Sequence, residues 1–159
     1  LATPAFAASY PSATVVGPSS AAAKNRALKC HLELDADSFQ SAIPECEVIK
    51  LDGCPFLDES VLFHRPTGSL IGADLLISAC AKDHFTWRWA ARITGCYEKV
   101  CVPPDVRSRT RPSDATARAI DRLTSLPLKR ILVAHCDPIV ERPAAQLAEA
   151  WQFSGATRR

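Results

Sequence analysis

Residues 61–77, VLFHRPTGSLIGADLLI, restrict the fold of this chain more than any other stretch. Two runs rich in apolar side chains, residues 61–65 and 69–73, lie on either side of a Pro-Thr-Gly sequence. Proline at the first position of a turn and glycine at its last position favour a type I turn closed by a left-handed residue. The sequence therefore predicts two antiparallel strands joined by a three-residue loop.

Asp74 follows the second of these strands, and it is the single acid in a window that is otherwise apolar on both sides. A buried carboxylate lowers stability unless it is paired or bound to a metal ion. We therefore expect Asp74 to be buried with a partner. The alternative is that Asp74 caps a helix that begins in residues 75–77.

A second stretch, residues 130–140 (RILVAHCDPIV), is where that partner is expected. A short run with β-branched residues ends at a His-Cys-Asp-Pro sequence, in which Pro138 ends any strand pairing. In α/β proteins ligands and catalytic groups often lie just beyond the ends of buried strands, and Asp74 and His135 both occupy such positions. The alternative for His135 is a hydrogen bond to Asp137 at the strand end.

The other histidines are not expected to be ligands. In the hairpin His64 faces roughly Leu70 beside the turn, which separates it from Asp74 by about 14 Å at about 3.4 Å per residue. His31 and His84 have no motif around them. The sequence therefore leaves these three side chains without a role in a shared site.

The rest of the chain reads as a mixed α/β domain. The spacing of apolar residues, together with prolines and capping residues, predicts the remaining helices and strands. Helices are expected at residues 4–10, 21–28, 38–43, 75–93, 114–125 and 143–153, strands at 13–16 and 46–51, and a loop at 101–111. Ser113 is the expected cap of helix 114–125, and Gly95 is the expected stop after helix 75–93. Trp87 and Trp89 fit either a substrate cleft or core packing.

Length and composition predict one globular domain with a core, residues 1–159, with a tail at 154–159. The chain has 159 residues, of which 47% are apolar and 23% are charged. A net charge of +2 and the lack of a basic block argue against a nucleic-acid partner. No apolar run approaches the roughly 18 residues of a membrane span, so no membrane partner is expected. Because the chain lacks methionine, we expect sequence upstream of Leu1.

The seven cysteines show no C-x-x-C spacing. Neither a zinc ribbon nor a disulfide framework is indicated, and most of the cysteines are expected to be buried thiols. Unpaired thiols favour a reducing compartment, which predicts a cytoplasmic location.

Two motifs resemble the later part of the metallo-β-lactamase fold, in particular an uncharacterised branch of that superfamily. In that branch a hairpin H-x-P-S/T-x-T/S-L-I-x-x-D-L precedes a strand V-x-A-H-G-D. Residues 64–75 read HRPTGSLIGADL and residues 133–137 read VAHCD. The opening YPSATVVGP, residues 10–18, is also similar to a strand of that superfamily, so the resemblance covers nearly the whole chain.

The resemblance implies a four-layer αββα sandwich, incomplete at its N-terminus, with a metal site at one sheet edge. Asp74 matches the metal-bridging aspartate of the family, and His135 matches its last histidine ligand. Asp137 then contacts the imidazole of His135 and fixes its tautomer without binding the metal itself. Zinc is the expected cofactor, with iron or manganese or no metal as alternatives, because imidazole and carboxylate ligands suit such ions.

The sequence also departs from the family. The H-x-H-x-D-H motif, which supplies most of the ligands, does not occur in this chain, and it is expected upstream of Leu1. Cys136 stands where the family prefers glycine, and it is either a metal ligand or a buried thiol.

Two functions therefore remain open. One is a metal-dependent hydrolase that acts on an ester, thioester, lactone or similar bond of an unidentified small molecule, and that is inactive as this chain alone. The other is a degenerate relative that lost the metal and serves as a binding or structural module.

Overall fold

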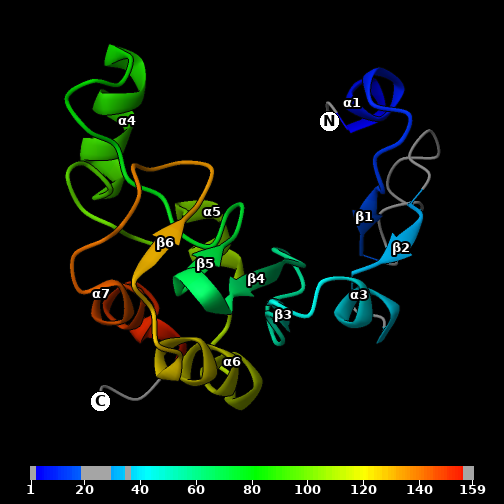
Figure 1. The fold of residues 1–159 in the computed structure, drawn as a ribbon. Coiled ribbons are helices and arrows are strands. Elements are labelled where there is room, and N and C mark those ends of the chain that lie inside the picture. The colour runs from blue at the N-terminus through cyan, green and yellow to red at the C-terminus, as the bar shows by residue number, and fades with distance from the viewer. Residues whose placement is uncertain (1–2, 19–29, 35–36, 156–159) are drawn as a thin grey trace. The chain divides into compact units, whose positions relative to one another are not determined.

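The computed structural model describes residues 3–18, 30–34 and 37–155, and it divides the chain into two compact units, Leu1–Val48 and Ile49–Arg159. The helix expected at residues 21–28 and most of the expected tail, residues 156–159, lie outside the described residues. The described elements form a mixed α+β fold (Figure 1). The single-domain prediction and the four-layer arrangement stay predictions.

The first unit contains short elements. Helix α1 spans Thr3–Ser9, and helix α3 spans Asp37–Ala42 and ends shortly before Pro44, as the sequence predicted. Strand β1, Val16–Gly17, pairs in parallel with β2, Leu32–Glu33. The strand predicted at residues 13–16 thus overlaps β1 by one residue, and the sequence did not predict β2.

A mixed four-stranded sheet with the order β3-β4-β5-β6 carries the candidate site (Figure 1). Its strands are β3 (Cys46–Lys50), which contains the boundary between the two units, β4 (Ser60–His64), β5 (Ser69–Ile71) and β6 (Arg130–Leu132). Strands β4 and β5 are antiparallel, and β5 and β6 are parallel. The sheet therefore brings residues 69–74 next to a segment about 60 residues further along the chain.

The predicted hairpin of β4 and β5 is confirmed, but its loop has four residues instead of three. A 3-10 turn, η1 (Arg65–Thr67), leads into Gly68, which has the left-handed conformation φ 62° and ψ 31°. Because of the longer loop, His64 pairs with Ser69 and not with Leu70 as predicted. Only glycine adopts this conformation without steric cost, which explains the residue at this position.

Helices α6 and α7 pack against each other. Helix α6, Asp114–Ser125, has the predicted bounds, and the Ser113 hydroxyl accepts the Thr116 N–H at 3.2 Å as its N-terminal cap. Helix α7, Pro143–Ala150, is shorter than predicted and is followed by the 3-10 helix η2, Gln152–Ser154.

One hydrophobic core joins these two helices to the sheet. The strands and the segment after β5 contribute Val61, Leu70, Leu75 and Ile131, and the helical part contributes Ile120, Leu123, Leu147 and Trp151. The Trp151 side chain is 0% exposed, and its indole N–H donates a hydrogen bond to the Leu75 carbonyl at 3.2 Å. The core therefore fixes the backbone next to Asp74.

The helix predicted at residues 75–93 is wrong in its first half. Helix α4 spans only Phe85–Thr94, and Gly95 ends it with φ 75° as predicted. Before it the chain is extended and pairs through isolated bridges, Ile77 with Cys101 and Ala79 with Tyr97. Three consecutive residues, Leu75, Leu76 and Ile77, are buried, so this segment lacks the polar face of a surface helix.

The loop predicted at residues 101–111 contains a helix, α5, which spans Pro104–Arg109. Pro104 occupies the first turn, where a proline needs no hydrogen-bond donor and has a favourable φ. Val106 is buried against the core. Pro104 therefore begins a helix inside the segment that was predicted to be a loop.

The expectation for the cysteines is wrong in two ways. Cys96 and Cys101 form a disulfide. Of the free cysteines only Cys54 is buried, and the others are partly buried. Because disulfides persist mainly in oxidising compartments, the argument from unpaired thiols for a cytoplasmic location loses its basis. None of the described helices is long and apolar enough to cross a membrane.

Reduction of the Cys96–Cys101 disulfide is expected to lower the free energy of unfolding by about 2 kcal/mol, since this short loop then gains entropy in the unfolded chain. Urea unfolding with and without dithiothreitol measures the difference. A Cys96→Ser/Cys101→Ser double variant is the control, and its stability should not respond to the reductant. Equal stability of the unchanged chain in both conditions would contradict the prediction.

Candidate site at the carboxyl ends of β5 and β6

Asp74 and His135 occupy equivalent positions beyond two neighbouring parallel strands. Ile71 pairs with Leu132, and the pairing continues through a hydrogen bond from the Ala134 N–H to the Ala73 carbonyl at 3.0 Å. The next residue on each strand is therefore Asp74 or His135. Their side chains meet, with His135 Nε2 3.1 Å from Asp74 Oδ1.

Glu59 holds the backbone of this site in place. Its carboxylate accepts hydrogen bonds from the N–H groups of Ala73 and Asp74, the latter at 3.0 Å. The register of the hairpin explains this contact, since Glu59 and Asp74 face each other three residues beyond the pair Leu62 and Ile71. Glu59 was not predicted, because the expected register is shifted by one residue and places Ser60 opposite Asp74.

Gly72 is required for the approach of Glu59 to this backbone. A Cβ atom at Gly72 would lie 2.7 Å from Glu59 Oε1 and 3.2 Å from a Val61 methyl group. Any larger residue would push the carboxylate away from the two N–H groups. The lack of a side chain at Gly72 therefore allows the Glu59 carboxylate to contact this backbone closely.

Burial raises the pKa of the Glu59 carboxyl above its ordinary value of 4.5. The two backbone hydrogen bonds oppose this shift, and the nearby negative charge of Asp74 adds to it. Glu59 is 9% exposed, so its ionised form loses most of its contact with water. The site thus contains a buried carboxyl next to an exposed one.

This pKa shift predicts a pH dependence of stability. The folded state binds the Glu59 proton more tightly than the unfolded chain, so this contribution to stability is fully present below pH 4.5 and is lost as the pH rises through the raised pKa. Relative to a Glu59→Gln variant, the unchanged chain should therefore lose stability with rising pH. Urea unfolding between about pH 4 and pH 8 measures the difference.

An Asp74→Asn variant serves as the control for this measurement, since it removes the charge that helps to raise the pKa. The decline with pH should be smaller in that background. If the unchanged chain instead gains stability relative to Glu59→Gln as the pH rises, the predicted sign is wrong.

The structural alternatives for Asp74 are not supported. No helix begins directly after Asp74, because residues 75–84 are not helical, so its side chain does not cap one. The expectation that Asp74 is buried is also wrong, since its side chain is 51% exposed and that of His135 is 57% exposed. An exposed ion pair contributes only about 0–1 kcal/mol, so stability alone gives little reason for this contact.

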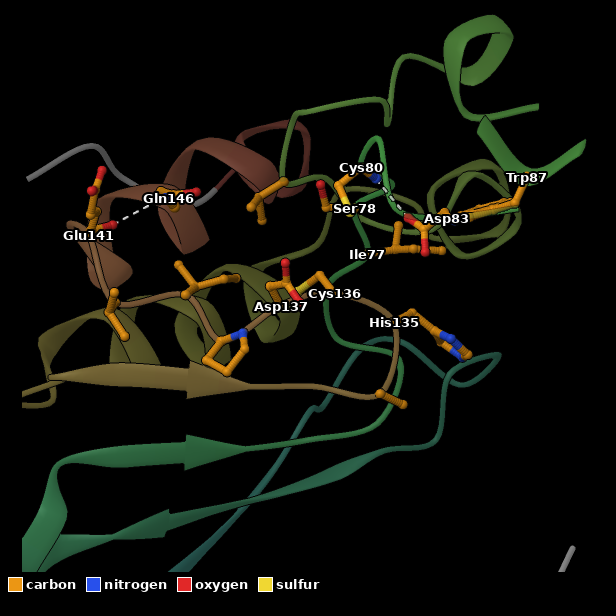
Figure 2. Close-up of a pocket in the computed structure, with 15 residues that line it drawn as sticks. Ile77, Ser78, Cys80, Asp83, Trp87, His135, Cys136, Asp137, Glu141 and Gln146 are labelled. Carbon is orange, nitrogen blue, oxygen red and sulfur yellow. Dashed lines mark hydrogen bonds between the residues drawn. The ribbon is translucent and has the colours of Figure 1, made fainter. Parts of the chain in front are cut away.

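Asp137 and Cys136 lie on the other side of the segment that carries His135. Figure 2 shows the Asp137 carboxylate and the His135 ring pointing in different directions. Burial, together with the charge of Asp137, raises the pKa of the Cys136 thiol to about 11. A thiol of this kind is protonated and unreactive at neutral pH.

A cavity of about 870 Å³ adjoins the site (Figure 2). His135, Cys136 and Asp137 line one part of its wall, and Trp87 lines another. Of the two tryptophans that the sequence left open, Trp87 lines the pocket and also packs against a small buried cluster that includes Ile77 and Ala91, whereas Trp89 is 68% exposed. We refer to this cavity as the His135 pocket.

The remaining histidines have local partners. His64 Nδ1 lies 2.8 Å from Thr67 Oγ1, and His84 Nδ1 lies 2.8 Å from Thr86 Oγ1. His31 Nδ1 accepts the Val15 N–H at 2.9 Å. These contacts account for the three side chains without a ligand role.

The described part of the chain, residues 3–18, 30–34 and 37–155, contains no group of three or more His, Cys, Asp or Glu side chains that could hold a metal ion. Asp74 and His135 are therefore a pair of donors without a third within it. Comparison of the chain with protein-family models, curated proteins and solved structures found no match.

Proposed function

We propose that this chain supplies two ligands, Asp74 and His135, to a divalent metal ion in a metal-dependent hydrolase. The observation that carries the proposal is the 3.1 Å separation between Asp74 Oδ1 and His135 Nε2 at the ends of adjacent parallel strands. Zinc is the first candidate, and iron and manganese are the others.

The spacing of the two donors supports this proposal. Two ligands that each lie about 2.0–2.1 Å from a tetrahedral zinc ion are about 3.3 Å from each other. The observed 3.1 Å is close to this value, so little movement would be required. A catalytic zinc ion normally has three protein ligands, so at least one further ligand comes from outside the described residues.

In this proposal the metal ion, Asp74, His135 and Glu59 have different roles. A metal ion at this position would lower the pKa of a coordinated water and polarise the bond to be hydrolysed. Asp74 and His135 hold the ion, and Glu59 orients the backbone of Asp74 through its two hydrogen bonds. The His135 pocket holds the substrate, which has an ester, thioester, lactone or similar bond.

The proposal includes a finer description of the fold. We propose that the four-stranded sheet belongs to a four-layer αββα sandwich of the metallo-β-lactamase type. The hairpin motif of residues 64–75 and the strand motif of residues 133–137 support this arrangement, and they occur here in a sheet where β5 and β6 are neighbours.

A second candidate function is a binding or structural module that lost the metal. The lack of a third donor among the residues that the structure describes favours it. In this case the contact between His135 and Asp74 persists as an exposed pair, and the pocket binds a ligand without chemistry.

Elemental analysis distinguishes the two functions. The purified chain is dialysed against a known concentration of zinc, iron or manganese and analysed for bound metal, with an Asp74→Asn variant in parallel. Because only two ligands are described, we expect weak zinc binding that exceeds the binding by the variant. Equal and negligible metal in both proteins would favour the second function. Hydrolysis of a nitrophenyl ester by this chain alone would contradict the expectation that it is inactive without further ligands.

A further inference from the structure

The His135 pocket has the size of a site for a small organic molecule. Its volume of about 870 Å³ lies within the range of about 300–1,000 Å³ that is typical of ligand pockets. His135, Asp83 and Trp87 lie toward one end of it, and Glu141 and Gln146 lie toward the other (Figure 2). A ligand in this pocket would thus extend from the candidate metal ligand along the segment after β6.

The charged groups on the described wall of the pocket are all of one sign. They are the carboxylates of Asp83, Asp137 and Glu141, and neither lysine nor arginine is among these lining residues. One oxygen of Asp83 accepts the Cys80 N–H at 2.7 Å, which orients this carboxylate at the wall. A ligand with a negative charge would meet repulsion from these three carboxylates.

Two arginines of α4, Arg88 and Arg92, each have a contact outside the pocket. Arg88 donates a hydrogen bond to the Ala81 carbonyl at 3.1 Å. The Arg92 guanidinium lies 3.6 Å above the centre of the Tyr97 ring. Neither residue lines the pocket, so their charges are not placed to pair with the wall carboxylates.

Part of the wall is apolar and includes an aromatic ring. Ile77, Val100 and Ile139 provide aliphatic surface, and Trp87 provides the ring. Tryptophan is the side chain that attracts cations most strongly through its π face. Acidic groups around an apolar wall with a tryptophan are complementary to an organic cation.

We propose that the His135 pocket binds a small molecule that has an ammonium group on an apolar body. The carboxylates receive the ammonium group, and the apolar body packs against Trp87 and the aliphatic wall. The inference that this molecule is the substrate rests on the proposed function, because a metal ion held by His135 would then lie next to a bond of the same molecule. Anionic molecules of equal size are excluded.

Three matched probes test the charge preference on the full chain: benzylammonium, benzyl alcohol and phenylacetate. They share a phenyl ring and differ mainly in charge. We expect benzylammonium to bind up to about fivefold more tightly than benzyl alcohol, since an ion pair with an exposed carboxylate is worth no more than that factor. Phenylacetate should bind most weakly. Ligand-observed NMR or calorimetry measures the three dissociation constants, and added salt should weaken benzylammonium alone.

Substitution of the wall carboxylates tests where the ammonium group binds. Asp137→Asn and Glu141→Gln should each weaken benzylammonium binding several-fold and leave benzyl alcohol unchanged. Both residues are exposed, so the substitutions leave the fold intact. Glu149→Gln is the matched control, because Glu149 is an exposed acid that does not line this pocket. Phenylacetate binding as tightly as benzylammonium, or no benzylammonium binding at millimolar concentration, would overturn the inference.

The same experiment separates this inference from the proposed function. Asp74 does not line the pocket, so Asp74→Asn should abolish metal binding and preserve the preference for benzylammonium. If the chain binds no metal but prefers benzylammonium, the proposed hydrolase function is wrong and the inference about the pocket still holds. A chain that binds metal but shows no charge preference would refute the pocket inference alone.

Discussion

Replacement of Trp151 by alanine is expected to lower the free energy of unfolding by about 3–5 kcal/mol. The side chain is 0% exposed, and its ring is stacked on that of Phe153 with centroids 5.5 Å apart. Alanine would leave a large cavity in the core, and it would also leave the Leu75 carbonyl without the indole donor. The loss of the hydrogen bond to Leu75 should also disturb the candidate site, since Leu75 follows Asp74 directly.

Urea or guanidinium unfolding measures this effect, and the chain provides a matched control. Trp89 is 68% exposed on α4, so Trp89→Ala should change the free energy of unfolding by no more than about 0.5 kcal/mol. A Trp151→Phe variant keeps an aromatic ring but removes the indole donor, and it should fall between the two. Similar losses for Trp151→Ala and Trp89→Ala would show that the core is assigned incorrectly.

Loss of either Asp74 or His135 is expected to lower the affinity for zinc by at least about tenfold. The reason is geometric, because two donors 3.1 Å apart can bind the same ion and neither has a described substitute. The substitutions Asp74→Asn and His135→Gln should not be additive, since removal of the first donor leaves a single ligand. The double variant should therefore bind zinc no more weakly than the weaker of the two single variants.

Calorimetry or competition with a zinc-sensitive dye measures these affinities. His84→Gln is the control, since His84 is an exposed histidine whose ring contacts Thr86. Its zinc affinity should equal that of the unchanged chain. Additive losses from Asp74 and His135 would mean that the two side chains bind zinc independently, at different places.

The local parts of the fold could be predicted from the sequence. The hairpin and the left-handed Gly68 follow from turn chemistry, and helix α6 with its Ser113 cap follows from periodicity and capping. These signals lie within a few residues of each other, and the structure agrees with them. The proximity of Asp74 and His135 could also be predicted from the sequence, because both residues follow strands with the pattern of a buried sheet.

The remaining features depend on contacts between distant residues. Residues 75–81 have apolar residues that suit a helix, but Ile77 and Ala79 form bridges with residues 97, 101 and 135 that hold residues 77–79 extended. Glu59 was missed because the strand was expected to begin at Val61, after it. The predicted three-residue loop would also have placed Ser60 opposite Asp74, whereas the observed four-residue loop places Glu59 there. Tertiary pairing thus decided these elements where local propensity did not.

Anomalous diffraction from crystals grown with zinc tests the central claim most directly, because it locates the ion without reference to activity. The account predicts a zinc peak about 2.0–2.2 Å from both a carboxylate oxygen of Asp74 and Nε2 of His135. Zinc bound elsewhere, or an unchanged contact between the two side chains with no ion beside it, would contradict the account.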